Sequence, residues 1–335
     1  TTNMYETDIN NVSKPVSVID KEDILTKSPT SVIESIKNTS GVSFSRAGGL
    51  GGQLVMRGFN SNDLKIPMSI NGERFRGRNT LEYNIIDPSR VEKIEVIRGP
   101  AAAIYGSESM AGMINIVTKK PKVSFDKEFT FKPIIQNMTY ESVNDLRGTR
   151  IEAEGSGYGF DVQFGASYKE ANDYETPEGK ALNSKFRTKS IDGSIGYSFN
   201  ENSRLGFNYK ISETETHRAG GLGGAPGTYA PLAQRVYMSE RPIKEKYVGL
   251  TYEINPLIKG IEKIDASVYR RSLWSDVVTT KYPNPTSVNE THRYVVGPLM
   301  YGGKVNAITE EILNTKFTAG VDFYLQDWEG AEQET

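Results

Sequence analysis

The sequence predicts an α/β domain followed by an antiparallel transmembrane β-barrel, of which about nine strands are present, so that the barrel is incomplete. Residues before Pro121 mix short helical patterns with strands, as in an α/β domain. After Pro121, apolar and polar residues alternate with a period of two over runs of about ten residues, which is the pattern of outer-membrane strands. We therefore expect two domains, residues 1–122 and residues 123–335.

The composition agrees with this prediction and argues against a nucleic-acid-binding protein, a disulfide-rich protein and a protein with membrane-spanning helices. The 335 residues carry a formal charge of −2, which gives no overall basic surface for nucleic acid. Cysteine is absent, so the chain has neither disulfides nor thiolate metal sites. No apolar run approaches the ~20 residues of a membrane helix. Barrel strands show no such run, because only every second residue of a strand faces lipid. No signal peptide is recognised at Thr1, so we expect a mature or trimmed chain.

The first domain contains three local signals before residue 80. Asp20 is placed to cap a short helix. Ser28-Pro29 predicts a second helix with the proline at its first position, and Gly41 is expected to end it. The Asn-Gly pair within Ser69–Arg74 predicts a β-hairpin.

The most specific segment runs from Asp87 to Lys119 and predicts strand, tight turn, short helix and strand. The first strand is apolar, Gly99-Pro100 ends it, Ala101–Tyr105 forms the helix, and Met113–Val117 is the second strand. This order of elements, and the amino-acid sequence itself, resemble the plug domain of TonB-dependent outer-membrane receptors over about thirty residues. The resemblance implies a plug inside a barrel of about 22 strands.

The alternating patterns after residue 123 define the expected barrel strands. Residues 156–159 and 200–202 are predicted as short turns, and residues 170–186, 213–244 and 273–292 as long loops on the extracellular side. Because an odd number of strands cannot close such a barrel, we expect an N-terminal piece with the whole plug and a little under half of the barrel. The expected strands lie near residues 128–136, 147–155, 160–169, 187–199, 203–212, 245–255, 261–272, 293–307 and 313–327.

Arginines dominate the candidate ligand site in the first domain. On a strand, alternate residues point to one side, and three guanidiniums there suit carboxylate or catecholate oxygens. An aromatic ligand could stack on Tyr83. Equally well, these arginines could pair with acidic residues of the barrel wall. The ligand-binding candidates of this domain are Arg46, Arg74, Arg76, Arg78 and Tyr83.

The predicted loop 213–244 carries the remaining ligand candidates, which are basic and aromatic residues suited to an anionic aromatic chelate. They are Arg218, Tyr229, Arg235 and Tyr237. The alternative is an adaptable surface loop without a ligand role. The seven residues from Arg46 to Gly52 recur letter for letter from Arg218 to Gly224, but no larger repeat surrounds them, which indicates coincidence in a glycine-rich chain.

Two further arginines take their expected role from the resemblance alone. Arg57 and Arg98 resemble the paired plug arginines of the family, which implies that they lock the plug to glutamates of the barrel wall.

Histidine bears on the choice of ligand. The two histidines, His217 and His292, both fall in predicted extracellular loops. Haem receptors of the family usually bind the haem iron with one histidine of the plug and one of the barrel. The absence of a plug histidine therefore argues against haem as the ligand. No metal site, catalytic residue or nucleotide-binding loop is expected, so the chain is not predicted to be an enzyme.

The resemblance therefore implies a receptor in the outer membrane of a Gram-negative bacterium. It would bind and import a ferric siderophore of the catecholate type, with no permanently bound cofactor. Its expected partners are TonB with its inner-membrane energising complex, the ferric chelate and outer-membrane lipid. A haem or haemoprotein receptor is the alternative, and a structural or adhesive barrel without transport is the alternative from another class.

Overall fold

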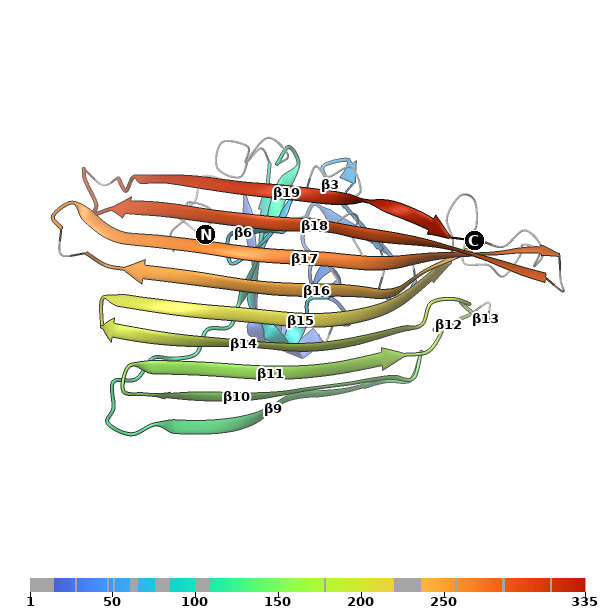
Figure 1. Ribbon diagram of the computed structural model, residues 1–335, viewed down its shortest axis with the longest axis horizontal. Coiled ribbons are helices and arrows are strands. Elements are labelled where there is room, and N and C mark those ends of the chain that lie inside the picture. Colours follow the sequence, from blue (N-terminus) through green and yellow to red (C-terminus); the bar gives the residue numbers. More distant parts are fainter. Residues whose placement is uncertain are drawn as a thin grey trace.

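The computed structural model describes residues 15–27, 29–46, 48–50, 52–60, 66–75, 85–99, 109–177, 179–219, 236–256, 258–284, 287–313 and 315–334. A small α/β domain lies against one face of a large antiparallel sheet (Figure 1). Within the described residues, no helix is long and apolar enough to span a membrane.

The small domain, the plug, is built on a five-stranded sheet in the order β1-β7-β8-β5-β6. Strands β5 and β8 are parallel, and the other neighbours in this sheet are antiparallel. A second sheet has the order β2-β3-β4. The elements are β1 (Val16–Asp20), α1 (Lys21–Lys27), α2 (Val32–Ser35), β2 (Val42–Arg46), β3 (Gly52–Met56), β4 (Phe59–Asn60), β5 (Met68–Ile70), β6 (Glu73–Phe75), the 3-10 helix η4 (Pro88–Arg90), β7 (Val91–Arg98) and β8 (Gly112–Thr118).

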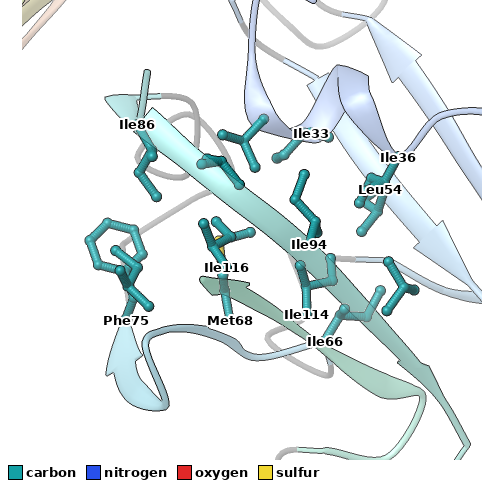
Figure 2. Packing of buried hydrophobic residues seen from close by; sticks show 14 of the residues in the cluster. Ile33, Ile36, Leu54, Ile66, Met68, Phe75, Ile86, Ile94, Ile114 and Ile116 are labelled. Atoms are coloured by element: carbon teal, nitrogen blue, oxygen red, sulfur yellow. The ribbon is translucent and has the colours of Figure 1, made fainter. Parts of the chain in front are cut away.

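The plug core lies between its main sheet and helix α2. Ile94 and Ile116 from the sheet pack with Ile33 from the helix, and all three are almost fully buried (Figure 2). The same cluster includes Ile243 and Leu273 from two strands of the large sheet. The plug core therefore continues into the barrel wall.

Two of the three local signals in the plug are confirmed. Asp20 caps α1, because its side chain accepts a hydrogen bond from the amide of Asp23 at 2.9 Å. The hairpin turn at Asn71-Gly72 has φ values of 54° and 77°, as a type I′ turn requires.

The predicted start of the second helix at Pro29 is wrong. Helix α2 begins at Val32, with Ser31 as its N-cap. The Ser31 hydroxyl accepts from the amide of Glu34, whose carboxylate accepts in turn from the amide of Thr30. This reciprocal cap is stronger than the preference of proline for the first turn. The helix ends at Ser35, ahead of the expected stop at Gly41.

The large sheet has nine strands, as predicted, in the order β19-β18-β17-β16-β15-β14-β11-β10-β9. Neighbouring strands are antiparallel throughout, and the hairpin of β12 (Glu175–Thr176) and β13 (Gly179–Lys180) stands apart from the sheet. The strands are β9 (Thr130–Glu141), β10 (Leu146–Gly157), β11 (Phe160–Ala171), β14 (Phe186–Asn200), β15 (Ser203–Ala219), β16 (Val236–Ile254), β17 (Ile261–Asn284), β18 (Ser287–Thr309) and β19 (Thr318–Glu334).

The predicted long loop 273–292 is wrong, because β17 and β18 continue through it as a hairpin that projects beyond its neighbours (Figure 1). Strands β15 and β16 likewise extend into the predicted loop 213–244. The polar residues there form a cross-strand ladder, with Val278 and Val295 buried between them. His217 and His292 accordingly lie on β15 and β18 and not in loops.

Candidate functional site at the plug–barrel interface

A row of charged and aromatic side chains crosses the face of the barrel wall that the plug contacts. The strand register places its members opposite one another on successive strands, with Gly165 between the first two. All are buried except Tyr247, which is half-buried. We call this row the lumenal belt; it consists of Glu152, Asp192, Lys210, Tyr247 and Arg271.

One end of the lumenal belt is organised by Arg150, whose side chain is fully buried. Its Nε donates to Glu152 at 2.6 Å, and its two Nη atoms donate to the two oxygens of Asp192 at 2.9 and 3.0 Å. Gly165 makes room for the guanidinium, because a Cβ at that position would lie 2.1 Å from Nη2. Such a bidentate, fully buried pair fixes both partners in one geometry.

The plug adds its own charges to this end of the lumenal belt. Arg90 lies 3.1 Å from Asp192, and Lys119 lies 3.6 Å from Glu152.

Asp87 of the plug accepts hydrogen bonds from the amide and hydroxyl of Ser89. Burial opposes its ionisation, but the positive charges of Lys169 and Arg150 on the wall outweigh burial and hold the pKa of Asp87 at about 2.

This depressed pKa predicts a specific loss of stability in acid. The stability that ionised Asp87 contributes is fully present above its ordinary pKa of 3.8 and is lost as the pH falls through about 2. The shift corresponds to about 2 kcal/mol. The free energy of unfolding, measured between pH 5 and pH 2, should fall more steeply for the native protein than for Asp87→Asn. Equal slopes for the two proteins would contradict this prediction.

The other end of the lumenal belt surrounds Glu245, which is buried. Glu245 stands opposite Ser212, two residues along the strands from the pair of Lys210 and Tyr247. Lys210 and Arg271 each donate to a different oxygen of Glu245 at 2.5 Å, and Ser212 donates at 3.2 Å. Lys210 also donates to the carbonyl oxygen of Ile85 in the plug at 3.3 Å. One carboxylate therefore positions two cations that face the plug.

Strand β6 of the plug lies against this second cluster. The Tyr247 hydroxyl donates to the carboxylate of Glu73 at 2.8 Å. The guanidinium of Arg271 lies 4.6 Å from the ring centroid of Phe75 and 4.7 Å from that of Tyr247. Burial raises the pKa of Glu73 above its ordinary value, although Tyr247, Arg271 and Lys304 oppose that rise.

Comparison with known proteins identifies the smaller domain. Residues 8–113 match the family model described as TonB-dependent Receptor Plug Domain. The chain carries the plug domain of a TonB-dependent receptor. It is a protein of the outer membrane of a Gram-negative bacterium.

Three similar proteins show how widely cargo varies among the receptors. The vitamin B12 transporter BtuB of Vibrio vulnificus (strain CMCP6) is 28% identical over 204 residues, which are 60% of this chain and 32% of the relative. The copper transporter OprC superposes with a TM-score of 0.74 at 21% identity, over 92% of this chain and 45% of that chain. The ferric-catecholate import receptor Fiu of E. coli K12 gives a TM-score of 0.67 at 17% identity, over 94% and 50%.

This receptor chain therefore spans about a third of the curated relative and about half of the two solved structures. At these identities the two structures show the shared fold alone. Their names, and that of the curated relative, describe transporters or receptors and not enzymes.

Of the predicted ligand residues of the receptor, Arg74 is the best defined. Its guanidinium lies 4.8 Å from the ring centroid of Tyr324 on β19, so the side chain faces the barrel wall beside the lumenal belt. Tyr237 is buried on β16. Arg46 and Arg218 are placed by their backbone in β2 and β15. Outside the described residues lie Arg76, Arg78, Tyr83, Tyr229 and Arg235.

The two predicted lock arginines have their described contacts inside the plug. Arg98 donates to the carbonyl oxygen of Ser40 at 2.5 Å. A Cβ at Gly99 would lie 3.3 Å from a terminal nitrogen of Arg57, so the two arginines flank the same turn. Their role as locks to the barrel stays a prediction.

The histidines of the receptor each face a polar partner. His217 lies 3.1 Å from the side-chain oxygen of Asn183, and His292 lies 3.0 Å from Asp276. Among the described residues, no group of three or more acidic or histidine side chains is arranged to hold a metal ion.

Sequence reasoning missed the lumenal belt because its members are scattered over five strands. In the sequence, each member looks like any other polar residue of an alternating strand, so nothing marks it as part of a site. Only the register brings them to one level. Arg90 and Glu73 carried a usable signal, since both are charged residues within the segments already recognised as plug motifs.

Proposed function

We propose that this receptor binds a ferric siderophore of the catecholate type and imports it with energy delivered through TonB. The observation that carries the proposal is the contact between the plug and the lumenal belt. Charged and hydrogen-bonded contacts suit a gate because they can be exchanged for water when the plug moves, whereas the apolar contact of the plug core with Ile243 and Leu273 would have to be exposed.

The catecholate assignment rests on the arginines in and directly after strand β6 of the plug. Arg74 faces the lumen wall at the start of a segment that also carries Arg76 and Arg78. Guanidinium groups offer rigid, paired donors that suit adjacent oxygens of an anionic chelate. The names of the relatives give vitamin B12, copper and a ferric catecholate as cargo, and the ferric catecholate is the one whose adjacent anionic oxygens suit paired guanidinium donors best.

The test uses the full-length receptor in iron-limited cells and a radiolabelled ferric catecholate. We expect binding and uptake in the native cells, binding without uptake when TonB is deleted, and weaker binding with Arg74→Ala. Arg187→Ala, on the outward face of β14, is the matched control and should leave binding unchanged. Uptake that persists without TonB would overturn the transport proposal. A Soret band on addition of haem, without catecholate binding, would instead identify a haem receptor.

A further inference from the structure

The hairpin turn of the plug, Asn71-Gly72, carries the only Asn-Gly pair in the sequence. It joins β5 to β6 and lies against the end of β8, which pairs with β5 in parallel. In an Asn-Gly pair the asparagine side chain is converted to aspartate especially readily, because glycine has no side chain to hinder the following amide nitrogen. The proposed transport function makes no use of this chemistry.

The conversion needs two neighbouring groups to meet. The backbone nitrogen of Gly72 loses its proton and attacks the side-chain carbonyl carbon, Cγ, of Asn71. A bond from this nitrogen to Cγ forms, the bond from Cγ to Nδ2 breaks, and ammonia leaves with the proton. Water then opens the resulting succinimide ring at either carbonyl group, which gives aspartate or isoaspartate. Water is the only co-reactant.

The nitrogen that would attack is held by Asn115 on β8. The amide of Gly72 donates to Oδ1 of Asn115 at 3.1 Å. The orientation of the Asn115 side chain is fixed, because its Nδ2 donates to the buried carboxylate of Glu95 at 3.0 Å and so leaves Oδ1 to face the turn. The hydrogen bond keeps the proton on the nitrogen of Gly72 and directs the N–H toward Asn115 instead of toward Cγ of Asn71.

The side chain that would be attacked is held by Thr118 on β8. Oδ1 of Asn71 accepts from the amide of Thr118 at 2.9 Å, and Nδ2 of Asn71 donates to the hydroxyl of Thr118 at 2.9 Å. The amide of Asn71 donates to the carbonyl oxygen of Ile116 at 2.8 Å. Both polar atoms of the Asn71 side chain are therefore tied to β8, and Cγ can turn toward Gly72 only if these bonds break.

The barrel wall adds a further restraint on the turn. Lys304 on β18 donates to the carbonyl oxygen of Asn71 at 3.0 Å. A Cβ at Gly72 would lie 2.6 Å from Nζ of Lys304, so the wall is in close contact with the turn. Closure of the succinimide ring therefore requires local opening of the hairpin, which costs free energy in a hydrogen-bonded sheet.

We propose that Asn71 is a site of spontaneous deamidation in this receptor, and that the seated plug suppresses the reaction by holding Gly72 on Asn115 and Asn71 on Thr118. The reaction proceeds while the hairpin is released from β8. Neither the site nor its protection depends on the cargo or on TonB, so the test below is independent of the proposed transport.

Conversion of Asn71 changes the hairpin and the strand that follows it. Isoaspartate inserts an extra carbon into the backbone, which a type I′ turn does not accommodate. Aspartate removes the donor that Nδ2 of Asn71 offers to Thr118. Strand β6 follows directly, and its three residues contact the barrel wall. A deamidated receptor therefore loses the fixed geometry of β6 against the wall.

The test uses the full-length receptor in detergent at mildly alkaline pH, followed by digestion and mass spectrometry that distinguishes asparagine, aspartate and isoaspartate at position 71. The same receptor unfolded in guanidinium chloride is the unprotected reference and should deamidate at least about tenfold faster than the folded receptor. Asn115→Ala removes the acceptor for the amide of Gly72 and should accelerate deamidation of the folded receptor about threefold or more.

Ser69→Ala is the matched control. Ser69 on β5 also donates to Oδ1 of Asn115, at 2.7 Å, but holds neither reacting group. Deamidation in this variant should stay within about twofold of the native rate. Equal acceleration by Ser69→Ala and Asn115→Ala would overturn the proposal, because general loosening of the sheet would then suffice. So would an unfolded receptor that keeps Asn71 intact, or equal rates in the folded and unfolded receptor.

A second pair of variants covers the case in which Asn115→Ala does not fold. Thr118→Val removes the hydroxyl that accepts from Asn71 and should accelerate deamidation, whereas Thr118→Ser keeps the hydroxyl and should react at the native rate. Equal rates in these two variants would contradict the role assigned to Thr118.

Discussion

Arg150→Ala is expected to lower the free energy of unfolding by about 3 kcal/mol, because it leaves buried carboxylates without their main partner. Arg150 is fully buried and donates to both Glu152 and Asp192. Lys119 and Arg90 of the plug remain beside these carboxylates, which keeps the expected loss at the lower end of the range for a broken buried pair. Urea unfolding of the purified receptor in lipid vesicles measures the effect.

The matched control is Arg187→Ala. Arg187 also pairs with a carboxylate at 2.6 Å, but its side chain is 42% exposed. An exposed pair of this kind contributes less than about 1 kcal/mol. If the two alanine variants lost the same stability, burial would not be what gives the Arg150 cluster its strength.

Gly112→Ala should disrupt the sheet of the plug severely. Gly112 begins β8 with φ of +145°, and a Cβ there would lie 2.1 Å from the carbonyl oxygen of Ile97 and 2.8 Å from the sulfur of Met56. The backbone of β7 would have to move, which we expect to cost at least about 2 kcal/mol. Faster hydrogen exchange in β7 and β8, measured by mass spectrometry, would report the damage.

Gly58→Ala separates the clash from the backbone conformation. Gly58 also has a positive φ, +80°, but no atom lies within 4 Å of the position that its Cβ would take. It therefore carries the conformational penalty without the collision. Exchange rates in β7 and β8 should stay near those of the native receptor in this variant. Equal acceleration in both variants would count against the steric explanation.

The elements that sequence reasoning predicted correctly are those with a local chemical cause. Asp20 caps the helix that follows it, and the Asn71-Gly72 turn needs two residues that tolerate positive φ. The nine barrel strands follow from alternation, which is local as well. The second helix was misplaced because Pro29 and Ser31 are both acceptable starts, and the side chain of Glu34 selects Ser31.

The failures share a different cause. The extension of β17 and β18 depends on the two strands supporting each other, and the polar residues along them resemble a loop when either strand is considered alone. The lumenal belt depends on the register of six neighbouring strands, because Gly165 on β11 lies between Glu152 and Asp192. Arg90, which contacts Asp192 across the plug–barrel interface, was not among the predicted site residues. Contacts between distant segments leave no periodic trace in a single sequence.

The lumenal belt also has a consequence for how the barrel is assembled. A slip of one residue between two neighbouring strands turns every side chain of the slipped strand to the other face. On β15 such a slip would move Lys210 into lipid, and on β14 it would do the same to Asp192. A slipped β14 or β15 would therefore carry a charged side chain into lipid, and the cost of that charge disfavours the wrong register.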